Sequence, residues 1–232
     1  MIVIDAIIPA LDEEGSLPKV LQGLAHRGLR RVIVVDNGSK DRTYAAARAG
    51  GADVVFTSER GYGAACLRGL ERLADGSLPP PDVVVFLDAD GADAPEDLAA
   101  VIFPVVAGLA DLVIGSRVKG EAEPGALTPV QRFGNALSCA LLRLIWDAEF
   151  TDLGPFRAVS FRALAQLQMQ DRDFGWTVEM QAKAARLGLR CVEVPVQYRR
   201  RRAGRSKIAG DLRGSFAAGT KILFTIGKEA LR

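Results

Sequence analysis

Val83-Val84-Val85-Phe86-Leu87-Asp88-Ala89-Asp90-Gly91 is the stretch of sequence that decides the fold. Five apolar residues in a row are typical of a central strand that is buried on both faces. Two carboxylates follow at the carboxyl end of this strand, where open α/β sheets bind their ligands. Because Asp88 and Asp90 would repel each other, the pattern predicts a cation between them, and oxygen ligands favour Mg2+ or Mn2+. The alternative is an Asp-rich turn or a helix cap.

The composition is that of a globular protein with a large core. The chain has 232 residues, of which 49% are hydrophobic and 25% are charged, so it needs no disulfide to fold. Cys66, Cys139 and Cys191 lie far apart in apolar surroundings, which indicates buried thiols in a reducing compartment. The single histidine, His26, argues against histidine-based catalysis. No signal peptide and no run of membrane-span length is recognised, so we expect a cytoplasmic protein.

Positive charge is concentrated in one segment. Residues 199–207 read Arg-Arg-Arg-Arg-Ala-Gly-Arg-Ser-Lys and carry six positive charges, whereas the whole chain has a net charge of only +2. A local basic cluster on a near-neutral chain favours recognition of phosphate groups over general polyanion binding. A solvated loop or a nucleic-acid-binding patch is the alternative.

Strands and helices alternate with short links through the first half of the chain. This order requires a mostly parallel sheet with right-handed crossovers. The expected strands are 2–8, 32–35, 54–56, 83–87 and 112–114, and the expected helices begin near Ser16, Asp41, Gly61 and Pro95.

The second half has a different pattern, with no linker between independent domains. It is expected to form an acceptor-side layer on the first half. The sequence predicts a loop over 120–129, an extended segment over 151–159, a strand over 190–196, and helices over 128–147, 161–168, 177–187 and from Asp211 onward.

Polar residues and glycines follow each strand of the first half, in residues 9–14, 36–39, 61–63 and 88–90. In a parallel sheet these segments meet at one edge, which predicts a single nucleotide-and-metal site. Asp36 can accept hydrogen bonds from a base or a ribose. Gly61 and Gly63 let the backbone approach a ligand, and the N-terminus of the following helix favours phosphate. Taken singly, each segment could equally be a turn or a helix cap.

The ordered set of motifs resembles family 2 glycosyltransferases, and most of all the dolichyl- and polyprenyl-phosphate sugar transferases. The likeness covers almost the whole chain. The motifs that carry it are Pro9-Ala10-Leu11-Asp12-Glu13-Glu14, the segment from Val34 to Thr43, Arg60-Gly61-Tyr62-Gly63-Ala64-Ala65, Asp88-Ala89-Asp90-Gly91, Gly115-Ser116-Arg117, the segment from Asp152 to Ala158, and Tyr198 to Lys207. The resemblance implies an inverting enzyme with a GT-A fold in a single α/β domain. Residues 1–117 would bind the nucleotide sugar, and residues 118–232 would form the acceptor side with the basic loop 199–207 and a C-terminal helix.

The resemblance, together with the strand-end pattern, implies roles for individual residues. Donor binding is expected of Pro9, Ala10, Leu11, Glu13, Asp36, Gly38, Ser39, Gly61, Gly63, Asp88 and Ala89; metal binding of Asp88 and Asp90; phosphate binding of Arg117, Arg201, Arg205, Ser206 and Lys207; and catalysis of Asp152 and Glu179.

The expected reaction moves a sugar from a UDP- or GDP-sugar to an acceptor, for which the resemblance implies polyprenyl phosphate. A hydroxyl acceptor would need Asp152 or Glu179 as general base, whereas a phosphate acceptor is already ionised. Relatives often carry Gln at the position of Ala92, so water or Asp93 would complete the metal shell here. The polyprenyl-phosphate enzymes frequently carry C-terminal membrane spans, and this chain shows none.

Other activities fit the sequence less well. A sugar-1-phosphate nucleotidyltransferase would need a basic glycine-rich loop after the first strand, but residues 9–15 are acidic. An RNA-binding module would interleave aromatic residues with the arginines, and residues 199–207 contain none. A dinucleotide-dependent oxidoreductase would need GxGxxG after the first strand, and this motif is absent there. No nucleic-acid partner is expected.

The last segment of the chain is apolar with Arg213, Lys221 and Lys228 interspersed. Such a helix either packs on the core or lies on an anionic bilayer surface. The expected location is therefore the cytoplasm, with peripheral attachment to the inner face of the membrane as the further possibility.

Overall fold

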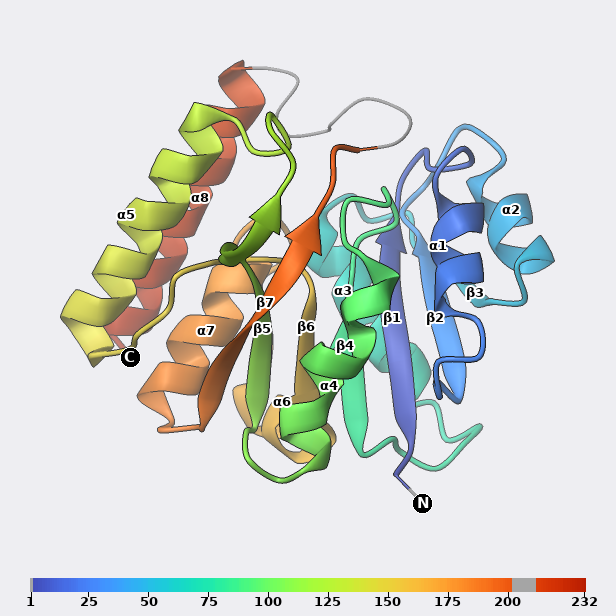
Figure 1. Ribbon diagram of the computed structural model, residues 1–232, viewed down its shortest axis with the longest axis horizontal. Coiled ribbons are helices and arrows are strands. Elements are labelled where there is room, and N and C mark those ends of the chain that lie inside the picture. The colour runs from blue at the N-terminus through green and yellow to red at the C-terminus, as the bar shows by residue number, and fades with distance from the viewer. Residues whose placement is uncertain (1, 202–211) are drawn as a thin grey trace.

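The computed structural model describes residues 2–201 and 212–232, and for residues 212–217 the backbone alone (Figure 1). Within these residues seven strands form one sheet, in the order β3-β2-β1-β4-β6-β5-β7. All neighbouring strands are parallel except that β6 runs antiparallel to both β4 and β5. The strands are β1 (Ile4–Ala10), β2 (Arg31–Asp36), β3 (Asp53–Phe56), β4 (Val83–Phe86), β5 (Leu112–Ala122), β6 (Arg157–Ser160) and β7 (Cys191–Tyr198). The expected mostly parallel α/β sheet is confirmed.

Helices cover both faces of this sheet (Figure 1). One face packs against α1 (Leu17–Leu24), α2 (Thr43–Ala49) and α4 (Leu98–Val106), the last preceded by a 3-10 turn over Pro95–Asp97. The other face packs against α3 (Tyr62–Leu73), α5 (Pro129–Trp146), α6 (Phe161–Leu167), α7 (Trp176–Arg186) and α8 (Leu212–Ala230).

The strand β4 lies at the centre of the molecule, as its apolar run predicts. Val84 and Phe86 point into the core on one side of the sheet, and Val83 and Val85 into the core on the other. All four are at most 2% exposed, and burying each contributes about 1.5–3 kcal/mol of hydrophobic free energy. The Phe86 ring also meets Trp176 of α7 edge-on, with 5.9 Å between ring centroids. This packing fixes the position of β4, and therefore the position of Asp88 just after its carboxyl end.

Several predicted boundaries were wrong, and the largest differences lie in β5 and in the segment before β6. The strand expected over 112–114 continues to Ala122, so the first residues of the expected loop 120–129 are strand. After a register shift, Glu121 and Ala122 pair with the end of β7. The segment 151–159, expected to be extended throughout, becomes a strand only at Arg157. The amides of Thr151 and Leu153 donate to the side chains of Glu193 and Asn135 instead of pairing with a strand.

Helix α8 packs on α5 and α7, with Ile226 in the core. Among the residues that the structure describes, no helix combines the length and apolar character needed to cross a bilayer. All three cysteines are free. Cys66 and Cys139 are buried as expected, whereas Cys191 is half-buried.

Candidate active site

Hydrogen bonds from backbone amides to side-chain oxygens connect the loops after β1 and β2. The amide of Asp12 donates to Ser39 Oγ at 3.0 Å, and the amide of Lys40 donates to Asp12 Oδ1 at 2.7 Å. The amide of Ser39 donates to Oδ1 of the buried Asp36 at 2.8 Å. Gly38 makes this turn with a φ of +79°, which favours glycine. The structure therefore brings the donor-binding candidates of both loops together.

The donor candidates of β1 line the start of the same region. Pro9 and Leu11 are half-buried and Ala10 is buried. Glu13 is also buried, and it accepts a hydrogen bond from Ser16 Oγ at 2.7 Å. Burial raises the pKa of Glu13 above its ordinary value, although Ser16 acts in the opposite direction.

The two glycines after β3 pack against another part of the backbone. A Cβ on Gly61 would lie 2.0 Å from the carbonyl oxygen of Arg172, and one on Gly63 would lie 2.0 Å from that of Asp171. The φ of Gly61 is +136°, a value that side chains rarely allow. This packing alone explains why glycine is required at both positions, and their contact with a donor stays a prediction.

Three aspartates converge at the carboxyl end of β4. The amide of Asp88 donates to Asp93 Oδ2 at 3.0 Å, and the amide of Ala92 donates to Asp90 Oδ1 at 2.9 Å. Burial, followed by repulsion from Asp93 and Asp90, raises the pKa of Asp88 well above its ordinary value. Burial, with a contribution from the charge of Asp90, raises the pKa of Asp93 to about 7. Ala89 is buried between the two residues of the DxD motif.

This acidic cluster fits a divalent cation. Oδ1 of Asp88 and Oδ1 of Asp93 are buried and accept no hydrogen bond, an arrangement that is costly for carboxylates without a positive partner. Among the described residues no three His, Cys, Asp or Glu side chains are already arranged to hold a metal. Mg2+ commonly completes its shell with water and substrate phosphates. The residues present therefore suit Mg2+ or Mn2+ bound together with a nucleotide.

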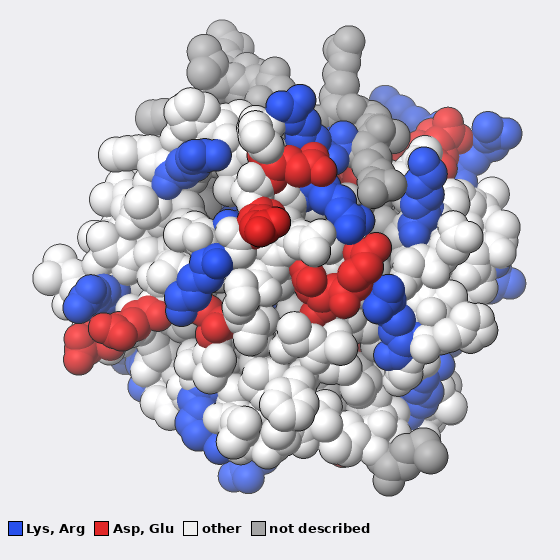
Figure 2. Space-filling view, viewed as in Figure 1, with Lys and Arg blue, Asp and Glu red and all other residues white. Residues whose placement is uncertain are grey.

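The described part of the basic segment lies across this cluster. The amide of Arg199 donates to the carbonyl oxygen of Ala92 at 2.8 Å, which brings the chain over the end of β4. Arg201 forms an ion pair with Asp90 at 3.3 Å and a second ion pair with Glu13. In Figure 2 acidic and basic side chains lie next to one another near the centre of this face. The other phosphate-binding candidates, Arg205, Ser206 and Lys207, lie outside the described residues.

Arg117 and Asp152 form a bidentate ion pair beside the cluster. Arg117 Nη2 donates to Asp152 Oδ1 at 2.6 Å, Nε donates to Oδ2 at 2.8 Å, and the amide of Arg117 donates to Oδ2 at 2.7 Å. The guanidinium carbon lies 5.0 Å from the ring centroid of Tyr198, a cation–π contact. Asp152 is fully buried, and the hydrogen bonds from Arg117 occupy both of its carboxylate oxygens. Arg117 is close enough to lower the pKa of Asp93, and the charge of Asp152 acts in the opposite direction.

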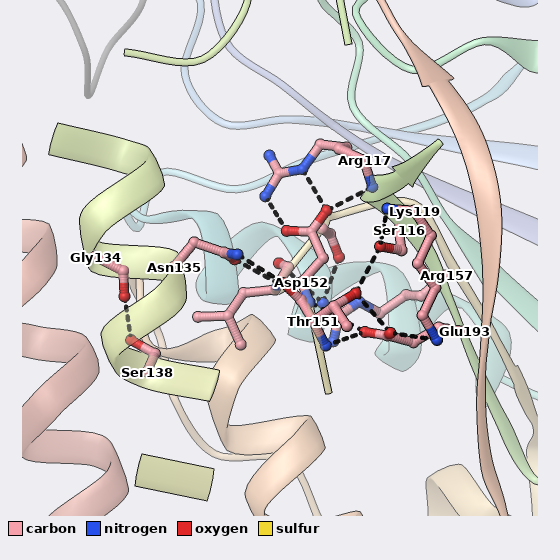
Figure 3. Close-up of polar contacts among 12 residues, drawn as sticks. Ser116, Arg117, Lys119, Gly134, Asn135, Ser138, Thr151, Asp152, Arg157 and Glu193 are labelled. Carbon is pink, nitrogen blue, oxygen red and sulfur yellow. Dashed lines mark hydrogen bonds and ion pairs between the residues drawn. The ribbon is translucent and has the colours of Figure 1, made fainter. Parts of the chain in front are cut away.

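A network that the sequence did not predict holds Asp152 in place (Figure 3). Glu193 Oε1 on β7 accepts hydrogen bonds from the amides of Thr151 and Asp152, at 2.7 and 3.0 Å. Its Oε2 accepts one from Thr151 Oγ1 at 2.7 Å and lies 3.1 Å from Lys119 Nζ. Asn135 of α5 donates to the carbonyl oxygen of Thr151 at 2.9 Å. The one feature of the sequence that could have indicated this network is Glu193, a lone carboxylate within a mostly apolar strand.

Glu179, the second predicted catalytic carboxylate, has a different environment. It is 1% exposed, lies 2.7 Å from Lys183 on its own helix, and accepts hydrogen bonds from the amides of Gln170 and Asp171. These contacts fix the loop before α7. The structure therefore does not join Glu179 to Asp152, and its catalytic role stays a prediction.

Residues 5–168 match the model of glycosyl transferase family 2. The chain belongs to this family. It is 37% identical over 217 residues to an uncharacterized glycosyltransferase of Mycobacterium tuberculosis (strain ATCC 25618 / H37Rv), covering 93% of this chain and 94% of that protein. It is 33% identical over 223 residues to the undecaprenyl-phosphate mannosyltransferase of Micrococcus luteus, covering 90% and 88%.

Solved structures agree with this assignment. Glucosyl-3-phosphoglycerate synthase from Mycobacterium tuberculosis, in complex with Mn2+, uridine-diphosphate and glucosyl-3-phosphoglycerate, superimposes with a TM-score of 0.74 at 25% identity, covering 98% of this chain and 80% of that chain. The same synthase in complex with phosphoglyceric acid gives a TM-score of 0.78 at 24% identity. The predicted GT-A fold and glycosyltransferase class are thereby confirmed.

Proposed function

We propose that this glycosyltransferase moves a sugar from a UDP- or GDP-sugar to polyprenyl phosphate, with inversion at the anomeric carbon. Its sequence relatives include an undecaprenyl-phosphate mannosyltransferase, and the structural neighbour was solved with uridine-diphosphate and Mn2+. Residues 1–117 would form the nucleotide-sugar-binding half and residues 118–232 the acceptor-side half. The enzyme would work in the cytoplasm, at the inner face of the membrane.

One observation supports a phosphate acceptor over a hydroxyl acceptor. Both oxygens of Asp152 are occupied by Arg117, and Glu179 is buried against Lys183. A hydroxyl acceptor needs a carboxylate with an oxygen available to take its proton. A phosphate oxygen is already ionised at neutral pH and needs no base. Asp152 then serves to hold the Arg117 guanidinium, which would attract the acceptor phosphate.

On the donor side, this chain's residues would bind and orient the diphosphate. Asp36 and the loop after β1 would hold the base and ribose, and Asp88 and Asp90 would hold the Mg2+ or Mn2+ ion. That ion, when bound, supplies positive charge that stabilises the leaving diphosphate. Arg201, which lies between Glu13 and Asp90, would add charge at the same oxygens. The acceptor oxygen would then attack the anomeric carbon from the face opposite to the diphosphate.

A soluble phosphorylated acceptor is the second candidate. The structural neighbour at 25% identity was solved with glucosyl-3-phosphoglycerate, which carries a phosphate but no lipid. Arg117 would suit the phosphate of either acceptor. Transfer to phosphoglyceric acid, however, joins the sugar to a hydroxyl oxygen and would need Asp152 or Glu179 as general base.

Turnover with matched acceptors tests these proposals. The purified protein is mixed with labelled UDP- and GDP-sugars, with and without Mn2+, and with either a short-chain prenyl phosphate or phosphoglyceric acid. We expect metal-dependent transfer to the prenyl phosphate from one donor. Transfer to phosphoglyceric acid alone would favour the second candidate, and equal transfer in the presence of a chelator would contradict the metal site.

A further inference from the structure

The outward faces of α5 and α8 are apolar. On α5, Phe133 is 70% exposed and Leu144 is 81% exposed, and on α8 Phe224 is 65% exposed. Large side chains exposed around them are Val130, Leu137, Ile145 and Leu223. On α5 the exposed residues at 129, 133, 136, 140 and 144 follow the spacing of a single helical face. An apolar stripe thus runs along the outside of α5.

These two faces belong to neighbouring helices. Helices α5 and α8 pack side by side at one flank of the molecule (Figure 1). In Figure 2 the flank that α5 forms is a largely white surface with isolated blue side chains, and red side chains gather only toward its lower end. Monomeric proteins rarely expose a contiguous apolar surface of this kind unless it meets a partner or a membrane. We call the outward residues of the two helices the α5–α8 face.

The charges on this face are positive. Arg132, Arg143 and Lys228 are exposed there. The sole acidic residue in the sequence of either helix, Glu229, is 1% exposed and lies 2.9 Å from Arg232. Beyond the end of α5, the exposed Glu149 lies 3.5 Å from Arg143. The occupant of this face must therefore offer apolar contact together with negative charge.

We propose that the α5–α8 face docks onto the surface of an anionic lipid bilayer. Apolar side chains would enter the boundary between headgroups and acyl chains, and the basic side chains would meet the lipid phosphates. A second copy of the chain fits the face less well. Two-fold pairing places the same patch on both sides, so Arg132 and Lys228 would meet like charges with no acid on either face.

Docking in this way would also place the acceptor side of the site close to the membrane. Phe133 is two residues from Asn135, which points inward and holds the carbonyl oxygen of Thr151 beside Asp152. A lipid phosphate at the bilayer surface would thus lie near the loop that carries the Arg117–Asp152 pair. This consequence rests on the proposed function, whereas the docking itself rests on the exposed residues alone.

Vesicle binding without donor or acceptor tests the docking. The full chain is sedimented with vesicles of phosphatidylglycerol and phosphatidylcholine, and with vesicles of phosphatidylcholine alone. We expect binding to the anionic vesicles that weakens as salt rises from about 0.05 to about 0.5 M. The double variant Phe133→Ser with Phe224→Ser should partition about tenfold more weakly, and so should Arg132→Gln with Lys228→Gln.

The matched control is Phe103→Ser, since Phe103 is 62% exposed on α4, away from the proposed face. It should bind vesicles as the wild type does. Melting temperatures identify any variant that fails to fold. If one of the two double variants does not fold, vesicle binding of the other one tests the docking. No binding at low salt, or equal loss in the control, would overturn the docking. A wild-type dimer that the Phe133→Ser, Phe224→Ser pair dissociates would overturn it in favour of a second copy.

Transfer to a short-chain prenyl phosphate without vesicles separates this inference from the proposed function. Transfer that persists while wild-type vesicle binding is absent overturns the docking alone. Vesicle binding that follows the expected pattern, with no transfer to any prenyl phosphate, overturns the acceptor and supports the docking.

Discussion

Oδ1 of Asp88 is buried and accepts no hydrogen bond, so a bound cation would stabilise the ionised carboxylate. Asp88→Asn removes a charged ligand and also a source of repulsion. We expect transfer to fall at least about 100-fold while the melting temperature stays the same or rises. The matched control is Asp82→Asn at the opposite end of β4, where the exposed Asp82 accepts a hydrogen bond from the amide of Val3. Near-normal turnover of Asp88→Asn would contradict the metal site.

Asp93 should make the stability of the metal-free protein depend on pH. Its pKa is raised from 3.8 to about 7 in the folded protein, so folding favours the protonated acid. The free energy of unfolding therefore falls as pH rises from about 4 to about 7, and the penalty is constant above that range. In Asp93→Asn this penalty is absent. With both proteins in chelator, the melting temperature of the variant minus that of the wild type should be larger at pH 8 than at pH 5. The same difference at both pH values would contradict the raised pKa of Asp93.

Arg201 forms ion pairs with both Glu13 and Asp90. In Arg201→Gln the two carboxylates lose that charge, so Mn2+ alone should bind severalfold more tightly. The nucleoside diphosphate should bind severalfold more weakly, since one cation near its phosphates is lost. Calorimetric titration measures both affinities. The control is Arg200→Gln, because Arg200 Nε donates to the carbonyl oxygen of Pro124 instead, and a parallel change in that variant would contradict a specific role.

At the scale of elements, the first half of the fold was predictable because its signals are local. An apolar strand followed by Asp88 or Asp36 identifies both the strand and its carboxyl end, and the parallel order then brings these ends together. The segment from Thr151 to Phe156 was not predictable in the same way. Its shape depends on Glu193 and Asn135, which are distant in sequence, and no local pattern encodes those contacts.

Strand β7 should control catalysis through this segment. Glu193→Gln weakens the hydrogen bonds to Thr151 and Asp152 and removes the ion pair with Lys119. We expect a loss of about 1–3 kcal/mol in stability, a lower kcat and an unchanged KM for the donor, because the acceptor side alone is disturbed. The exposed Glu121→Gln on β5 is the control. A higher donor KM with an unchanged kcat would contradict a positioning role for Glu193.

At the scale of the whole molecule, the order of strands explains why the residues proposed for donor and acceptor binding meet. Beyond β4, the sheet is extended by β6, β5 and β7 in that order. The end of β7 then returns to the β4 aspartates, since Tyr198 forms a bridge with Asp93 and Arg201 reaches Asp90. The motifs on both sides were predictable from sequence. The contacts between these motifs, including the pairing of Arg117 with Asp152, depend on the path of the chain in space. They could be identified only in the structure.

The most direct measurement compares two acceptors of the same chain length, a prenyl phosphate and the corresponding prenyl alcohol, with the same labelled nucleotide sugar and Mn2+. Because Asp152 and Glu179 are both engaged, transfer to the phosphate should be at least about 100-fold faster, with the anomeric configuration inverted in the product. Equal or faster transfer to the alcohol would contradict the base-free phosphate acceptor and would show that one of these carboxylates is released to act as a general base.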